Sequence, residues 1–314
     1  MLPLWQAQSN RERVSFDDLP APSFTGTRLV EPDLRRLREL IDWQFYFLAW
    51  ELKGKYPAIL AQPAARELFE DANCLLDEII DGEQLQARGV YGFWPAHSGG
   101  DDIIVDGEPG SPARQFPMLR QQVSRTDTRP NRCLADFVAP AGDHVGGFAV
   151  CIAGAEGLAR RYEADQDDYR SISVKALADR LAEASAEYVH LQARRSWYEP
   201  AAEPTIEELH AERFRGIRPA FGYPACPDHS EKGTLFDLLD AARIGVALTE
   251  SYAMTPAASV SGLLLAHPAA RYFAVGKIGR DQVEDYAARK GVPVAEAEYW
   301  LRPNLAYDPS LAAV

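Results

Sequence analysis

The sequence predicts an α+β fold in which helices pack against an antiparallel-rich sheet. Amphipathic segments mix with short apolar runs bordered by glycine and proline, and neither a regular β–α–β alternation nor an internal repeat is present. At 314 residues, 46% hydrophobic and 25% charged, the chain could form one large domain or two modest ones. One domain is favoured because no linker interrupts the sequence after residue 30.

The N-terminal third predicts a lead-in followed by helices. Residues 1–30 lack periodicity and are rich in proline, serine and polar groups, which is typical of an extended lead-in or a linker remnant. Helical periodicity runs from Asp33 to a stop at Gly54. A second helix is predicted over 64–81, where apolar residues recur at helical spacing and a glycine follows.

The middle of the chain predicts strands and then the longest helix. Residues 89–110 alternate and turn on glycines, which indicates strand, loop and strand. The apolar runs 134–140 and 143–154 predict buried strands. Residues 171–197 predict a long helix with one buried stripe, formed by Val174, Leu177, Leu181, Ala184 and Tyr188.

The C-terminal part mixes short helices with a predicted hairpin. Residues 234–244 predict a short helix, and 259–279 predict two apolar strands around the turn HPAAR. Asp281 is expected to cap a helix that ends at Gly291. A last helix is expected over 295–301.

Composition excludes several function classes. The net charge of −13 argues against nucleic acid as a partner, because phosphate binding needs clustered Lys and Arg. No apolar stretch approaches the roughly 20 residues of a membrane span, and the N-terminus lacks the features of a signal peptide, so a cytoplasmic location is expected. The cysteines are too few and too scattered for a disulfide framework; they are Cys74, Cys133, Cys151 and Cys226.

Motifs for common catalytic chemistry are absent. The chain contains no GxSxG nucleophile elbow, no GxGxxG after a strand and no phosphate-binding P-loop. Cys226 and His229 have CxxH spacing, but no second Cys/His pair accompanies them, so no metal site is predicted. Asp101 and Asp102 would point to opposite faces of a strand, and a surface turn is expected there.

The loop RPAFGYPACPDHSEK, residues 218–232, combines stiffness with several polar groups. Its prolines restrict the backbone, so the loop could line a cavity at low entropic cost, and Gly222 would allow close approach to a ligand. The planar fork of Arg218 suits a carboxylate, and Tyr223 adds an apolar face with a polar tip. Composition alone leaves open whether this is a ligand loop or a packing loop.

Two carboxylates add to this picture. Asp42 lies in the apolar and aromatic run LIDWQFYFLAW, so it must reach water or have a cationic partner. Glu183 is the middle of a ladder of acids, Asp179–Glu183–Glu187, which disfavours a helix unless a cation lies nearby. A solvated helix face is the alternative for Glu183. An arginine and two acids around an aromatic groove would suit a cationic, zwitterionic small molecule.

Seven segments, in order, resemble one family. They are IDWQFYFLAWELKGKYPAIL, FWPAHSGGDDI, CLADFVAP, VKALADRLAEASAE, GIRPAFGYPACPDHSEK, SYAMTPAASVSG and ARYFAVGKIGRDQVEDYA. Together they resemble the C-terminal activation domain of cobalamin-dependent methionine synthase, over roughly residues 25 to 308.

The resemblance implies a fold, a function and partners. The fold would be a single C-shaped domain with a mostly antiparallel twisted sheet, over residues 31–314. The domain would bind S-adenosylmethionine and support reductive methylation of cob(II)alamin, a reactivation step in methionine biosynthesis. Cobalamin would be carried by a partner module, and flavodoxin or an equivalent donor would supply the electron.

Site roles follow from the same resemblance. Asp42 would receive the ammonium end of the ligand, and Arg218 would bind the ligand along the loop, through its carboxylate. Tyr272 and Phe273 would border the ligand, with Glu183 and Glu212 as weaker contacts. Tyr223 and His229 would face the corrin from the loop that contains Gly222 and Pro224.

The sequence also departs from the whole enzyme. The Gly99–Gly100 pair stands where a larger residue is expected, which would loosen that turn. The zinc-binding substrate barrels and the DxHxxG cobalamin motif are absent, so the chain alone should not methylate homocysteine. It would be an excised module or a separate activation subunit, with a slight preference for the former. The alternative function is a non-catalytic docking module for a corrinoid protein, with S-adenosylmethionine binding lost or regulatory.

Overall fold

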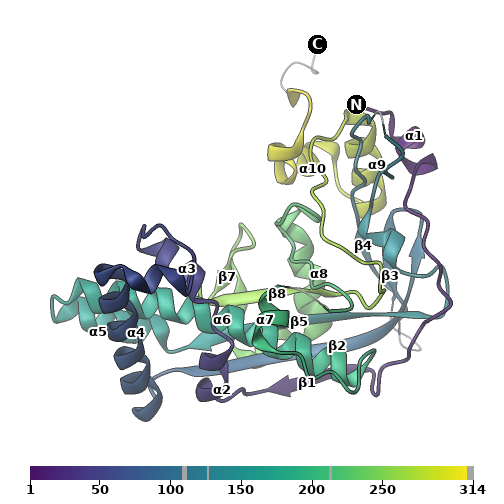
Figure 1. Ribbon diagram of the computed structural model, residues 1–314. Coiled ribbons are helices and arrows are strands. Elements are labelled where there is room, and N and C mark those ends of the chain that lie inside the picture. The colour runs from purple at the N-terminus through teal and green to yellow at the C-terminus, as the bar shows by residue number, and fades with distance from the viewer. Residues whose placement is uncertain (108–111, 126, 212–213, 310–314) are drawn as a thin grey trace.

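The computed structural model (Figure 1) describes residues 1–107, 112–125, 127–211 and 214–309. It confirms the α+β prediction. One antiparallel sheet has the strand order β4-β3-β2-β5-β8, and β1 also pairs with β2. The strands of this sheet are β1 Gly26–Val30, β2 Gln86–Gly99, β3 Asp102–Val105, β4 Arg114–Pro117, β5 Asp143–Ala153 and β8 Ser259–Leu264. A separate pair consists of β6 Ala247–Leu248 and β7 Met254–Thr255.

The long pair β2·β5 forms the centre of the sheet. Its register runs from Gln86 opposite Ala153 to Ala96 opposite Asp143. The other edge of β2 is shared, because β1 pairs with its first half and β3 with its last residues. Both faces of β5 are buried, so its sequence is apolar almost throughout.

Helices cover the two faces of the sheet. The α-helices are α1 Leu4–Ser9, α2 Leu34–Glu39, α3 Trp43–Ala49, α4 Pro63–Asp81, α5 Ala155–Ala164, α6 Asp168–Ser196, α7 Ile206–His210, α8 Lys232–Leu239, α9 Arg280–Lys290 and α10 Val294–Trp300. The 3-10 helices are η1 Ala58–Ala61, η2 Leu134–Phe137, η3 His229–Glu231, η4 Ala241–Ile244 and η5 Arg302–Asn304. Val189 of α6 packs with Phe148 on one face, and Leu235 of α8 packs with Ala149 on the other.

The molecule has a C-shaped outline, as predicted. Figure 1 shows α2 to α5 at one end of the sheet, while α1, α9 and α10 rise at the other end. The second group has a small core of its own, in which Val283 and Tyr286 of α9 pack with Leu301. Within the described residues, the helices are too short or too polar to cross a membrane.

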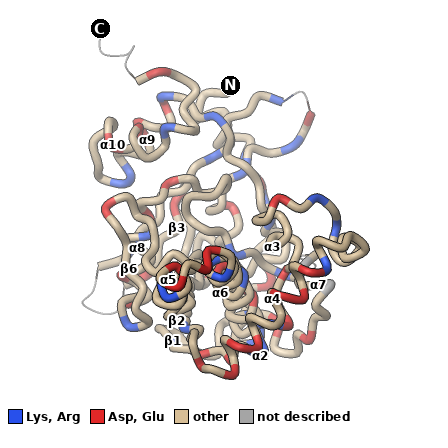
Figure 2. The backbone as a smooth tube through the Cα atoms, turned by 90° about the vertical axis from the view of Figure 1, so that its left-hand side faces the viewer, with Lys and Arg blue, Asp and Glu red and all other residues tan. Residues whose placement is uncertain are grey.

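The strongest helix predictions are confirmed. The predicted helix 64–81 is α4, and the predicted helix 171–197 is α6, whose expected stripe is buried at every position except the half-buried Tyr188. The charged outer surface of α4 forms ion pairs that include Arg35–Asp81 from α2 and Arg170–Glu78 from α6. Figure 2 shows acidic residues along this end of the molecule with basic residues among them.

The prediction of one continuous helical segment from Asp33 to Gly54 is wrong in one respect. The segment is broken into α2 and α3 because two aspartates each cap a new helix start. The Asp33 carboxylate accepts from the Arg35 amide, and the Asp42 carboxylate accepts from the Gln44 amide. Such caps satisfy amides that have no partner inside the helix.

The strand predicted at 134–140 and the hairpin predicted at 259–279 are also wrong. Residues 134–137 form η2, because the Asp136 carboxylate accepts from the Cys133 amide and turns the chain. In the hairpin, only β8 forms. Its free edge pairs with residues 217–219, at the start of the loop: Ile217 exchanges hydrogen bonds with Leu265, and the Leu263 amide donates to the Pro219 carbonyl.

The first thirty residues are more structured than the extended lead-in that was expected. They contain α1 and β1. The prediction that Asp281 caps α9 is wrong, because Gly279 takes the capping position and Asp281 lies inside the first turn. The Asp281 carboxylate instead accepts hydrogen bonds from the Leu4 amide and the Gln122 side chain. The domain boundary at residue 30 remains a prediction.

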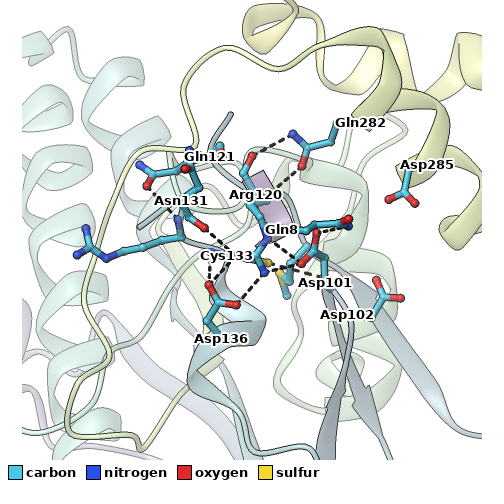
Figure 3. A network of polar contacts seen from close by, with 12 residues as sticks. Gln8, Asp101, Asp102, Arg120, Gln121, Asn131, Cys133, Asp136, Gln282 and Asp285 are labelled. Carbon is cyan, nitrogen blue, oxygen red and sulfur yellow. Dashed lines mark hydrogen bonds and ion pairs between the residues drawn. The ribbon is translucent and has the colours of Figure 1, made fainter. Parts of the chain in front are cut away.

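The turn at Asp101 and Asp102 is buried, contrary to the predicted surface turn. Figure 3 shows Asp101 and Asp136 on either side of Arg120, whose side chain is completely buried. Asp102 instead pairs with Arg289 of α9. The adjacent aspartates therefore do point to opposite sides, as the strand geometry predicts, but each meets an arginine. The Arg120 backbone also exchanges two hydrogen bonds with Gln282, which fixes α9 on the sheet.

Candidate functional site

The predicted loop 218–232 is held rigidly on both sides. Its start lies along the edge of β8, where the Pro219 carbonyl is so close that a side chain at Gly262 would clash with it. A tight turn follows, in which the Gly222 amide donates to the Cys226 carbonyl at 2.8 Å. The Val275 amide then donates to the Pro224 carbonyl at 2.8 Å. The segment that was predicted as a second hairpin strand thus braces the loop.

Arg218 lies between α6 and this bracing segment. Its guanidinium Nη1 is 2.7 Å from the Glu187 carboxylate and 3.3 Å from Nδ1 of His190. Its backbone amide donates to the Tyr272 hydroxyl at 3.0 Å. Burial, and then the charges of Arg218 and Arg194, hold the pKa of His190 well below its ordinary value. A neutral His190 can accept from Arg218, so the guanidinium has a fixed orientation.

Tyr272 lies beside Arg218, and Phe273 follows it in the chain; their predicted role of bordering the ligand remains a prediction. Tyr272 is exposed, and its hydroxyl binds the loop rather than pointing into the core. Phe273 is half-buried against the core of the sheet and against the small core of α9. Of the two aromatic residues, Tyr272 therefore contacts Arg218, while Phe273 joins the two cores.

Asp42 lies at the N-terminus of α3, half-buried, with its carboxylate on the Gln44 amide at 2.9 Å. A carboxylate in this position is stabilised by the positive end of the helix dipole. The sequence required Asp42 to reach water or a cation. The structure shows partial exposure together with a helix cap, which the sequence reasoning did not consider.

One face of α6 links the two ends of the candidate site. Arg180 lies 5.4 Å from the ring of Phe45 in α3, and Glu187 binds Arg218. These positions on α6 are about 10 Å apart along the helix axis. Glu183 lies between them on the same face, half-buried, because spacings of three and four residues share a face. Helix α6 thus contacts both α3, whose N-terminus carries Asp42, and Arg218, and Glu183 lies between these two contacts along α6.

Tyr223, Pro224 and His229 form an exposed rim beside the turn at Gly222. Tyr223 is 62% exposed, which is unusual for a tyrosine that is held on a rigid loop. His229 is also exposed, and its ring lies against Gly222. Glu212, the remaining predicted contact, lies outside the described residues.

The thiol of Cys226 has a structural role. It is buried and donates to the Ala220 carbonyl at 3.0 Å, and burial raises its pKa well above the ordinary value. Within 1–107, 112–125, 127–211 and 214–309, no group of three or more His, Cys, Asp or Glu side chains is placed to hold a metal ion.

Sequence reasoning missed Glu187 and His190 as partners of Arg218, and it gave no role to Lys232, the last residue of the loop. Glu187 did carry a signal, because the ladder of acids disfavours a helix unless a cation lies nearby, and Arg218 is such a cation. His190 and Lys232 gave no such signal. Their importance depends on which side chains the fold brings next to them.

Two comparisons with known proteins agree with this geometry. A family model described as "Vitamin B12 dependent methionine synthase, activation domain" matches residues 33–291. A solved structure of the MetH reactivation domain bound to AdoHcy is 46% identical to the chain, with a TM-score of 0.94, and the alignment covers 98% of this chain and 100% of that one. The resemblance seen in the sequence is confirmed: the chain belongs to the family of activation domains of vitamin B12-dependent methionine synthase.

Proposed function

We propose that the chain binds S-adenosylmethionine and holds its methyl group for transfer to cobalamin carried by a partner module. The observation that carries this proposal is the 46% identical reactivation domain whose structure contains AdoHcy. AdoHcy is S-adenosylmethionine without the sulfonium methyl group. A site that binds AdoHcy is therefore complementary in shape to the product that remains after methyl transfer.

The proposed roles place the charged ends of the ligand apart. Asp42 receives the ammonium group, and Arg218 binds along the loop through the carboxylate. The anchoring of Arg218 by Glu187 and His190 supports this role, because a fixed guanidinium loses little entropy when it binds a ligand. Tyr272 and Phe273 border the ligand, and Glu183 and Glu212 are weaker contacts.

The chain's part in the reaction is positioning. The sulfonium sulfur is already a good leaving group and keeps the electron pair of the broken carbon–sulfur bond, so no general base is needed. Cobalamin, when docked, supplies the acceptor for the methyl group once flavodoxin or an equivalent donor has added one electron. Holding two reacting groups in line can supply a large part of such a barrier. The rigid loop and the exposed Tyr223 and His229 suit a face that meets the corrin.

The wider roles are proposed on the same basis. The chain would act in the cytoplasm as a reactivation unit of methionine synthase in methionine biosynthesis. Methylation of homocysteine would need the other modules of that enzyme.

Calorimetric titration of the chain with S-adenosylmethionine and with AdoHcy tests the proposal. We expect one saturable site for each compound. Docking of a cobalamin-loaded module without any heat from either compound would instead support a non-catalytic docking module.

A further inference from the structure

Lys232 at the start of α8 is a buried cation with unusual partners. Its side chain is almost fully buried, with 6% of the residue exposed. The ammonium group donates to the Tyr252 carbonyl at 2.9 Å and contacts Nδ1 of His229 at 3.0 Å. No carboxylate among the described residues forms an ion pair with it, whereas Arg120 and Arg194, which are also buried, each pair with a carboxylate. Burying an ammonium group in this way is unfavourable for stability.

The contact with Lys232 determines the protonation of His229. An ammonium group can only donate, so Nδ1 of His229 must accept, and the ring proton must then lie on Nε2. Burial and then the charge of Lys232 lower the pKa of His229, against a smaller opposite effect of Asp228. The imidazole is therefore neutral near neutral pH.

Gly222 allows the ring to take this position. A Cβ atom at Gly222 would lie 2.1 Å from Cε1 of His229, so any other residue would push the ring away. The φ angle of +94° at Gly222 is also one that side-chain-bearing residues rarely adopt. Nε2 makes no hydrogen bond to the described residues, and the His229 side chain is exposed. The rim thus presents one N–H donor next to Tyr223.

From these contacts we infer that Lys232 and Gly222 are positioning residues, which hold His229 as a neutral Nε2–H donor for a carbonyl oxygen of the docked corrin. This inference rests on the proposed function. The corrin periphery carries amide side chains, whose carbonyl oxygens accept such a hydrogen bond. The corrin also surrounds a cobalt cation, which a charged imidazolium would repel but a neutral imidazole does not.

Nuclear magnetic resonance of the chain labelled with ¹⁵N-histidine tests the protonation. Long-range ¹H–¹⁵N spectra distinguish the two neutral forms of the ring, and the His229 signals are those lost in His229→Gln. We expect the Nε2–H form and a pKa below the ordinary value. In Lys232→Met, both neutral forms should appear and the pKa should rise. Lys277→Met is the matched control, because Lys277 also donates to backbone carbonyls but does not contact His229.

Docking of a module loaded with cob(II)alamin supplies the second measurement. Below the raised pKa of His229 in Lys232→Met, the ring becomes charged, and docking should weaken about tenfold for each pH unit. At pH about 8 the ring is neutral, so docking should change little. Lys232→Met combined with His229→Gln should remove this pH dependence, since glutamine keeps an N–H donor that does not titrate. Gly222→Ala should weaken docking at every pH.

The outcomes separate the inference from the proposed function. An Nδ1–H ring in the native chain, or an unchanged His229 pKa and pH profile in Lys232→Met, overturns the inference. S-adenosylmethionine is titrated into the same samples. If S-adenosylmethionine does not bind, the proposed function is overturned. The ring state of His229 is measured independently and still decides the inference about Lys232.

Discussion

Arg218 and Glu187 form an ion pair at 2.7 Å that joins the rigid loop to the longest helix of the fold. Their side chains are 18% and 9% exposed, so the pair is shielded from water. Truncating one member of such a pair leaves the other charge buried. Any variant of Arg218 therefore changes stability as well as ligand binding, and the two effects must be measured separately.

Arg218→Ala should weaken S-adenosylmethionine binding by about 1.5–3 kcal/mol, the range for hydrogen bonds to charged groups. The midpoint of thermal unfolding should also fall, because Glu187 loses its partner. In the double variant Arg218→Met with Glu187→Gln, the midpoint should recover while binding stays weak. Calorimetry and thermal unfolding on the same samples check this. Full binding in the double variant would show that Arg218 is only scaffold.

Asp42 allows a similar separation, because it both caps α3 and would bind the ligand. Asn and Asp are comparable helix caps, whereas Ala lowers stability by about 1 kcal/mol. Asp42→Asn should therefore keep the stability and lose ligand affinity, since the charge that attracts the ammonium group is gone. Asp42→Ala should lose both. Equal affinity of Asp42→Asn and the native chain would exclude the proposed ammonium contact.

Arg120 should be essential for folding. Its buried guanidinium binds Asp101 and Asp136, and Arg120→Met would leave two buried carboxylates without their partner. A loss of about 3–5 kcal/mol in unfolding free energy is expected. The control is Arg129→Met, whose exposed pair with Asp127 should contribute little to stability, because water and salt screen exposed charges. Urea unfolding measures both, and similar losses in the two variants would contradict this account.

Glu231 should make stability fall as the pH rises. Burial raises the pKa of Glu231 to about 7, despite the nearby charge of Lys290. The folded state thus binds this proton more tightly than the unfolded chain, whose glutamates have a pKa of about 4.3. The contribution of Glu231 to stability is complete below the unfolded value and is lost as the pH rises through 7.

Glu231→Gln removes this dependence. The variant should match the native chain at a pH of about 4 and be more stable than it at pH 8, by about 1–3 kcal/mol. Urea unfolding at the two pH values measures the difference. A variant that becomes relatively less stable at pH 8 would show that attraction to Lys290 outweighs the effect of burial.

The sequence by itself determined the local elements and the family. The periodicity of residues 64–81 and 171–197 predicted α4 and α6, because a helix buries residues three and four positions apart and this pattern is readable along the chain. The prolines of 218–232 predicted a stiff loop for the same local reason. Seven ordered motifs identified the activation-domain family, which the comparisons confirm.

Only the tertiary structure decided which distant residues meet. Ile217 and Pro219 occupy the edge of β8 where the sequence predicted a hairpin partner, because an open strand edge accepts any extended segment that reaches it. The partners of Arg120 and Lys232 likewise could not be read from spacing, since they lie on separate elements. Burial and pairing depend on packing between elements, and a one-dimensional pattern contains only the spacing within them.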